Sequence, residues 1–267
     1  MTTPLQQAFK ALRETGRKGV IPYITAGDPS LEATYEILLA LACGGATAIE
    51  LGVPFSDPAA DGPVIQRACE RALARGVRLN DVLAVAGRAA KQTGVPIVLF
   101  SYLNPLLRHG LDRLAEDAAA AGLAGVLVTD LPAEAAGGFS QALQRRGLDL
   151  VSLVAPTSTE SRIASIAEHA TGFLYAISVT GVTGARRQLG ADVRELLARL
   201  RRVTGLPVAV GFGVSTPEQA RELWTQGADA VIVGSALVKK IEEAGAEAPA
   251  QVESFVRELV AAQAVEA

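Results

Sequence analysis

Glu50 and Asp61 are the acidic residues of this sequence that are best placed to move protons. Glu50 lies inside the apolar run TAIELGV, where a charged side chain is costly unless it is paired or functional. Burial there would raise its pKa by desolvation, which suits a general acid or base near neutral pH. Asp61 follows in the loop FSDPAADGP, and two carboxylates in different environments can divide the acid and base roles.

Each of these carboxylates also has a plain structural alternative. Glu50 could lie on the outward face of its strand and pair with a helix residue, as structural acids in such chains do. Asp61 or Asp57 could form turns, because Asp before Gly or Pro is a common turn signal.

Three glycine turns late in the chain predict a phosphate-binding site. VAVGFGVSTPEQA places Gly211 and Gly213 after one apolar run, and VIVGSALVKK places Gly234 and Ser235 after the next, at the head of a short helix. GVTG at 181–184 can add a third turn. Backbone N–H groups at helix N-termini bind phosphate, although any one of these turns alone would be an ordinary tight turn. Their occurrence after three consecutive strands favours a phosphate-binding site.

The other reactive residue types exclude several chemistries. All five lysines lie in predicted helices or ahead of the first strand, so a Schiff-base mechanism has no candidate nucleophile. His109 and His169 fall away from strand ends, which makes a zinc site improbable. Cys43 and Cys69 are interpreted as buried thiols in helices rather than a disulfide. The acidic and hydroxylic residues expected at the reactive face, besides Glu50 and Asp61, are Asp28, Asp57, Asp130, Tyr102 and Tyr175.

Short apolar runs that alternate with helical patterns provide the scaffold for these residues. Eight runs suit parallel strands under helices, which fits either a closed barrel or a long doubly wound sheet. Their regular recurrence without a composition break favours the α/β fold of a (β/α)8 TIM barrel, with reactive residues at the C-terminal strand ends. The predicted strands are 19–24, 47–51, 95–100, 124–129, 148–154, 172–177, 206–211 and 229–233.

Additional helices and the chain length complete the predicted architecture. An N-terminal helix with Thr3 as its cap and Pro4 in its first turn precedes the barrel, and extra helices follow strands 2 and 8, the last over 249–264. Helices starting at Ser30, Asn80, Thr159 and Thr216 are also predicted from their caps. A length of 267 residues fits a single barrel domain over 1–267.

Composition limits the partners and the location. The net charge of −3, with 25 basic and 28 acidic residues interspersed, offers no basic stripe for nucleic acid and no patch for anionic lipid. No apolar run approaches the ~18 residues that span a membrane. The N-terminus has no signal-peptide pattern, so a cytoplasmic location is expected.

The segment ELGVPFSDPAADGPVIQ at 50–66 resembles the active-site signature of the tryptophan synthase α subunit family. Similarity continues along nearly the whole chain, through PYITAGDP, SYLNP, VTDLP, SVTGVTG, GFGVS and GSALV. The resemblance implies a carbon–carbon lyase that cleaves indole-3-glycerol phosphate to indole and glyceraldehyde 3-phosphate. It also implies an α2β2 complex in which a β subunit makes L-tryptophan with pyridoxal phosphate, while this chain needs neither cofactor nor metal.

The resemblance also implies residue roles, with Glu50 as the strand-end acid/base, Asp61 as the loop carboxylate and Tyr175 near the reacting glycerol. The implied phosphate ligands are Gly184, Phe212, Gly213, Gly234 and Ser235. The implied indole slot is formed by Tyr23, Phe100, Tyr102, Leu127, Thr183 and Ile232. Phe100 stands where the family more often has Leu or Met, and Tyr23 where it frequently has Phe, which bears on the size of the pocket.

Two loops, 53–62 and 178–192, are expected to close over the site when substrate and the β subunit bind. The family resemblance places the partner against the first loop and the region of Asn104 and Pro105. A sugar-phosphate isomerase or epimerase is an alternative that shares the glycine turns but lacks ELGVPFSDP. A non-catalytic barrel that only regulates its partner would be favoured if Glu50 or Asp61 were replaced, and both are present.

Overall fold

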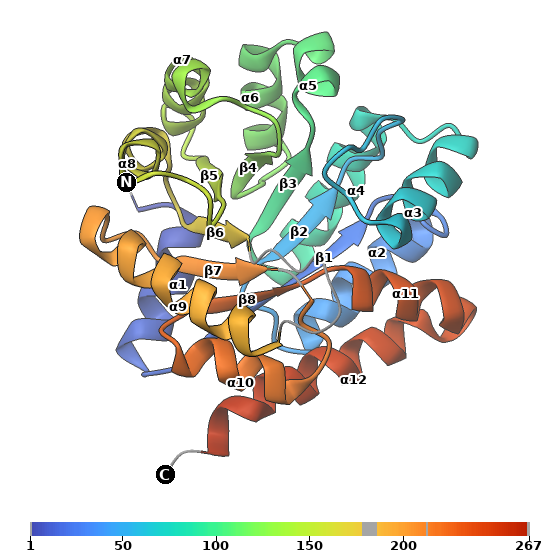
Figure 1. The fold of residues 1–267 in the computed structure, drawn as a ribbon. Coiled ribbons are helices and arrows are strands. Elements are labelled where there is room, and N and C mark those ends of the chain that lie inside the picture. The colour runs from blue at the N-terminus through green and yellow to red at the C-terminus, as the bar shows by residue number, and fades with distance from the viewer. Residues whose placement is uncertain (1, 178–185, 212, 266–267) are drawn as a thin grey trace.

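Eight parallel strands close into a barrel in the order of the chain (Figure 1). The computed structural model describes residues 2–177, 186–211 and 213–265. Strands β1 and β8 close the ring with Ile21 opposite Ile232, and β1 pairs with β2 so that Tyr23 lies opposite Glu50. The strands are β1 (Gly19–Thr25), β2 (Ile49–Gly52), β3 (Ile97–Ser101), β4 (Gly125–Val128), β5 (Asp149–Val154), β6 (Leu174–Ile177), β7 (Val208–Gly211) and β8 (Ala230–Val233). The predicted barrel is therefore confirmed, although several strands begin one or two residues later than predicted.

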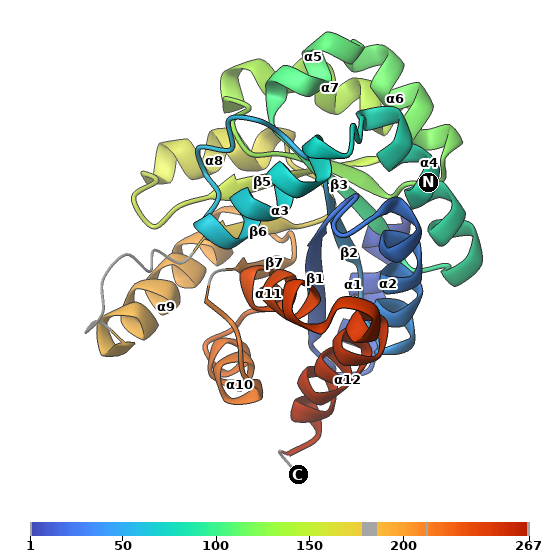
Figure 2. The same ribbon diagram turned by 90° about the vertical axis from the view of Figure 1, so that its right-hand side faces the viewer.

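An outer ring of helices surrounds the barrel, as Figures 1 and 2 show. The predicted extra helices after β2 and β8 are present, and the last of them packs against α2 on the outside. The helices are α1 (Pro4–Glu14), α2 (Leu31–Cys43), α3 (Pro63–Ala74), α4 (Leu79–Thr93), α5 (Leu103–His109), α6 (Leu111–Ala120), α7 (Ala133–Gln144), α8 (Glu160–His169), α9 (Arg186–Val203), α10 (Pro217–Thr225), α11 (Ser235–Ala244) and α12 (Ala248–Ala261), with 3-10 turns η1 (Gly245–Glu247) and η2 (Ala262–Val265).

Side-chain caps set most of the predicted helix starts. Thr3, Ser30, Thr159 and Thr216 each accept an N–H bond from the first turn of the following helix. The predicted cap at Asn80 is wrong. Helix α4 already starts at Leu79, because the Asp81 carboxylate accepts the Arg78 N–H at 2.9 Å and stabilises an earlier first turn.

Helix α5 is an element that was not predicted. It begins directly after Tyr102, and its first N–H group, that of Leu103, donates to Asp130 Oδ1 at 2.6 Å. Asp130 lies in the loop after β4, so the stabilising acceptor comes from a neighbouring strand end. A helix of this length has little stability of its own and depends on such tertiary contacts.

Helix α1 closes the N-terminal end of the barrel. Phe9 is buried against Phe173, which precedes β6, with ring centroids 5.4 Å apart. The Thr3 hydroxyl donates to the buried carboxylate of Asp149 at the start of β5, and Gln6 Nε2 donates to the same group at 3.3 Å. The barrel interior above this layer is apolar, and it includes Ile21, Ala48, Val98, Leu127 and Val151.

The two cysteines differ in their surroundings. Both are free thiols, Cys69 is buried as predicted, and Cys43 is exposed, so the prediction of a buried Cys43 is wrong. Cys43 is the last residue of α2, where the helix pattern alone does not specify which side is covered. Within the described ranges, no helix is both long and apolar enough to cross a membrane.

Candidate active site

Glu50 occupies the second position of β2 and points into the barrel. Its side chain is fully buried, lines a cavity at the C-terminal strand ends, and has no hydrogen-bond partner for either carboxylate oxygen among the described residues. Burial raises the pKa of Glu50 from 4.5 to about 8, because the carboxylate form has lost its hydration. The alternative of an outward, ion-paired Glu50 is therefore wrong, and the group is a protonated acid at neutral pH.

Asp61 lines the same cavity, on the loop that connects β2 to α3. Its Oδ2 accepts a hydrogen bond from the Tyr102 hydroxyl at 3.0 Å, and that hydroxyl accepts the Ala60 N–H at 2.9 Å. Burial raises the pKa of Asp61 to about 6, while the bond from Tyr102 acts in the opposite direction. Asp61 is thus mainly ionised at neutral pH, which gives the site one proton donor and one acceptor.

The ring of Tyr102 also anchors the Asp61 loop. Phe55, on the same loop, packs against it with ring centroids 5.2 Å apart. One phenol therefore holds the loop through an apolar contact and through two hydrogen bonds, on Ala60 and on Asp61.

Tyr102→Phe is expected to raise the pKa of Asp61 above about 6, because the phenol O–H stabilises only the ionised carboxylate. The ionised fraction at a given pH then falls, so the acid limb of the pH profile of kcat/KM moves to higher pH. The profile of the purified variant between pH 5 and pH 9 measures this. A limb that stays in place, or moves down, would contradict the proposed bond.

The cavity has a volume of about 170 Å³ and combines an apolar wall with the two carboxylates. Tyr23 and Phe100 meet edge to face in that wall, with centroids 5.0 Å apart. The residues expected at the site from the sequence that line the cavity are Tyr23, Glu50, Asp61, Phe100, Tyr175, Gly213, Ile232, Gly234 and Ser235.

The other expected site residues lie elsewhere. Tyr102 contacts Asp61 and does not line the described cavity, and Leu127 lies fully buried in the barrel interior. Thr183, Gly184 and Phe212 lie outside the described residues, as do residues 178–185 of the expected closing loop.

Several lining residues were missed by the sequence reasoning. Thr129 and Ile177 lie at the ends of predicted strands, where their position alone could have suggested them. The remaining missed residues are Ala60, Gly62, Ile65, Leu153 and Val214.

Two glycines make room for the tyrosine rings of the cavity. A Cβ atom on Gly52 would lie 2.3 Å from the Tyr23 hydroxyl oxygen, and one on Gly211 would lie 2.1 Å from that of Tyr175. Burial, followed by the charge of Glu50, raises the pKa of Tyr175 well above its ordinary value. Tyr175 therefore stays a hydrogen-bond donor beside the acid.

The part of the cavity lining at the start of α11 suits an anion. Gly234 and Ser235 line the cavity there, and among the described residues no side chain caps this helix. The first N–H groups of a helix attract negative charge when nothing else binds them. Gly213, with a φ of 73°, lines the same cavity.

The other carboxylates of the predicted reactive face have structural partners. Asp28 pairs with Arg71, Asp57 accepts from the Ser56 hydroxyl at 2.5 Å, and Asp130 binds the start of α5. No lysine, histidine or cysteine lines the cavity in the part of the chain that the structure describes. The arrangement supports proton transfer between two carboxylates and a bound phosphorylated molecule.

Comparisons with known proteins identify the family of this chain. The family model described as "Tryptophan synthase alpha chain" matches residues 9–266. A tryptophan synthase alpha chain from Solibacter usitatus (strain Ellin6076) is 52% identical over 260 residues, covering 96% of this chain and 97% of that protein. A tryptophan synthase structure from Mycobacterium tuberculosis superposes with a TM-score of 0.90 at 40% identity over 100% of both chains. A tryptophan synthase complex from Pyrococcus furiosus gives 0.83 at 40% identity, covering 91% of this chain and 98% of that one. The chain therefore belongs to the tryptophan synthase alpha chain family.

Proposed function

We propose that this chain cleaves indole-3-glycerol phosphate to indole and glyceraldehyde 3-phosphate, as the α subunit of a tryptophan synthase. The observation that carries the proposal is the pair of opposed carboxylates. The pKa of Glu50 lies above neutrality and that of Asp61 below it, in one cavity that ends at an uncapped helix N-terminus.

The proposed step is a retro-aldol cleavage in which the indole ring takes up the electrons. Protonated Glu50 delivers its proton to ring carbon C3, and Asp61 stabilises the positive charge that develops at the ring N–H. The bond from C3 to the glycerol carbon then breaks, its electron pair restores the aromatic ring, and the adjacent hydroxyl becomes the aldehyde. The hydroxyl proton returns to the Glu50 carboxylate, so the atoms and charges balance.

The proposed chemistry uses acid/base groups of this chain and no cofactor. The described residues contain no group of three or more His, Cys, Asp and Glu side chains that could hold a metal ion. Pyridoxal phosphate belongs to the proposed β partner. We propose that residues 1–267 act as one domain in the cytoplasm.

A β subunit is the proposed partner, supported by family membership and by the Pyrococcus furiosus complex. The proposed contact surface joins the 53–62 loop to α5, which carries Asn104 and Pro105. Leu107 on α5, 55% exposed, is the large apolar side chain that stands out from the described surface. A partner that covers Leu107 and presses on the loop would also favour a fixed position of Asp61, in an α2β2 assembly.

Ser235→Asp is expected to raise KM for the substrate at least tenfold, with a smaller effect on kcat. A carboxylate at the first position of α11 would compete with the substrate phosphate for the helix N-terminus and repel it. Steady-state kinetics compare it with Ser235→Asn, which has a similar size and no charge. An unchanged KM would show that the phosphate lies elsewhere.

The direct test of the function is to incubate the purified chain with indole-3-glycerol phosphate, with and without a β subunit, and to measure indole. Release of indole, faster with the partner, supports the proposal. Conversion of the substrate without loss of its glycerol carbons would instead favour an isomerase, and no turnover in either condition would refute the proposed activity.

A further inference from the structure

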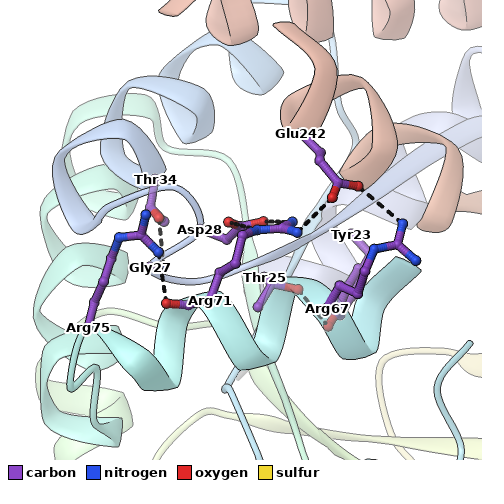
Figure 3. Close-up of polar contacts among 9 residues, drawn as sticks. All are labelled: Tyr23, Thr25, Gly27, Asp28, Thr34, Arg67, Arg71, Arg75 and Glu242. Atoms are coloured by element: carbon purple, nitrogen blue, oxygen red, sulfur yellow. Dashed lines mark hydrogen bonds and ion pairs between the residues drawn. The ribbon is translucent and has the colours of Figure 1, made fainter. Parts of the chain in front are cut away.

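Helices α3 and α11 are joined by a cluster of ion pairs (Figure 3). The cluster consists of Asp28, Arg67, Arg71 and Glu242. Arg71 Nη1 lies 2.8 Å from Glu242 Oε1, and Arg67 Nη2 lies 3.3 Å from Glu242 Oε2. Glu242 on α11 is thus shared by two arginines of α3, one helical turn apart.

Asp28 fixes the orientation of the Arg71 guanidinium. Arg71 Nε and Nη2 donate to the two oxygens of Asp28 at 2.8 and 2.7 Å, and the Asp28 side chain is only 4% exposed. The two parallel bonds define the plane of the guanidinium, so its remaining nitrogen points in a set direction, toward Glu242 (Figure 3).

The loop that carries Asp28 is itself anchored. The N–H of Gly27 donates to the Thr34 hydroxyl at 2.9 Å, which ties the loop to α2. Gly27 has a φ of 83°, and an added Cβ would lie 2.5 Å from Val77. Arg71 therefore bridges α11 to a fixed point on the end of β1.

The two joined helices both start at the lining of the cavity. Helix α3 starts two residues after Asp61, and α11 starts with Ser235. Beneath the ion pairs, Ala68 of α3 and Val238 of α11 pack together with Tyr23 in a buried apolar cluster. An apolar contact permits sliding, whereas a fixed guanidinium paired with one carboxylate defines a single register.

We propose that Arg71 is a positioning residue which, through Glu242, fixes the separation between the Asp61 carboxylate and the phosphate-binding start of α11. The inference rests on the proposed function for its catalytic consequence, because the substrate must contact the Asp61 carboxylate and the start of α11 at once. Misplacement of a catalytic group by about 1 Å can cost as much as 10²-fold in rate. Loss of one of several supports for Asp61 is expected to cost about tenfold.

The testing variant is Glu242→Gln, since removal of Arg71 would leave the buried Asp28 unpaired and endanger the fold. The Gln amide oxygen can still accept from one of the two arginines, whereas its NH2 group faces the other and cannot accept. Glu243→Gln is the matched control, because Glu243 is the next residue of the same helix, pairs with Lys239 at 3.6 Å, and has 64% of its side chain exposed.

Kinetics separate positioning from plain loss of structure. For Glu242→Gln we expect kcat for indole-3-glycerol phosphate to fall about tenfold, while the affinity for glycerol 3-phosphate, which fills only the phosphate end, changes less than twofold. Arg71→Lys keeps the charge but cannot make the two parallel hydrogen bonds to Asp28. Its kcat should lie between those of Glu242→Gln and the original chain. Equal kcat values for Glu242→Gln and Glu243→Gln would overturn the proposal, as would a parallel loss of glycerol 3-phosphate binding.

Amide hydrogen exchange decides the same point without any turnover. The amides of Ala60 and Asp61, which donate to Tyr102 Oη and to the carbonyl of Pro58, should exchange about tenfold faster in Glu242→Gln than in the original chain or in Glu243→Gln. Unchanged exchange would refute the positioning role. Faster exchange in a chain that releases no indole would support this role while refuting the proposed reaction.

Discussion

Glu50→Gln should reduce turnover by at least 10²-fold and, at the same time, stabilise the fold. Gln has nearly the shape of protonated Glu but no acidic proton to transfer, so the acid step is lost. The stability gain follows from the burial of Glu50, which has no hydrogen-bond partner among the described residues to offset ionisation.

The gain in stability should depend on pH. The pKa of Glu50 is about 8 in the folded chain and about 4.5 when unfolded, so between these values only the unfolded state releases the proton. The free energy of unfolding therefore falls as pH rises from 4.5 to 8, by on the order of 3 kcal/mol at pH 7. Gln does not titrate, so the variant escapes this loss.

Chemical denaturation at pH 4.5, 7 and 8.5 measures the effect, with the exposed Glu243→Gln as control. The two variants should be about equally stable at pH 4.5, and Glu50→Gln should be the more stable by a margin that grows with pH. A margin that is constant across this range would contradict a buried, raised-pKa Glu50. Near-normal indole release would contradict its role as the acid.

Asp61→Asn should also lower turnover by at least 10²-fold, with little effect on the fold. The amide oxygen can still accept the Tyr102 hydrogen bond, so the loop keeps its anchor, but the negative charge that stabilises the developing cation is lost. Because the pKa of Asp61 is about 6, the acid limb of kcat/KM near that pH should disappear in the variant.

Asp57→Asn is the matched control for this measurement, because Asp57 lies on the same loop, is exposed, and its carboxylate accepts a hydrogen bond from the adjacent Ser56 hydroxyl. It should keep both the rate and the limb when the isolated chain is assayed. If Asp61→Asn retains a limb near pH 6, another group controls activity there.

Local sequence signals were sufficient for the barrel and for most helix starts. Thr3, Ser30 and Thr216 each accept the backbone N–H of the residue three positions later. Such caps are local, so the residue types can be read directly from the sequence. Helix α5 escaped prediction because its stabilising acceptor, Asp130, lies 27 residues from Leu103 in the chain. Contacts of that kind become visible only when the strands are closed into a ring.

The sequence predicted which face of a strand a site residue lies on, but not how far along the barrel axis it lies. Leu127 and Thr129 share one face, because side chains alternate along a strand. Only Thr129 reaches the cavity, while Leu127 fills a lower layer of the barrel. Similarly, Asp28 and Asp61 both follow strands in loops of similar composition, and the difference between them is made by Arg71, far along the chain from Asp28.

Because α1 closes the base of the barrel, the site is closed at its N-terminal end. Phe9, Phe173 and the Thr3–Asp149 contact close the base, and apolar side chains fill the layer between that base and Glu50 throughout the described residues. Glu50 lines the cavity that the substrate occupies during the proposed reaction. The hydrogen that appears on carbon C3 is then the one that Glu50 carried before the substrate bound, and the glycerol hydroxyl restores it. Each cycle leaves Glu50 protonated again, so turnover takes up no net proton from the solvent.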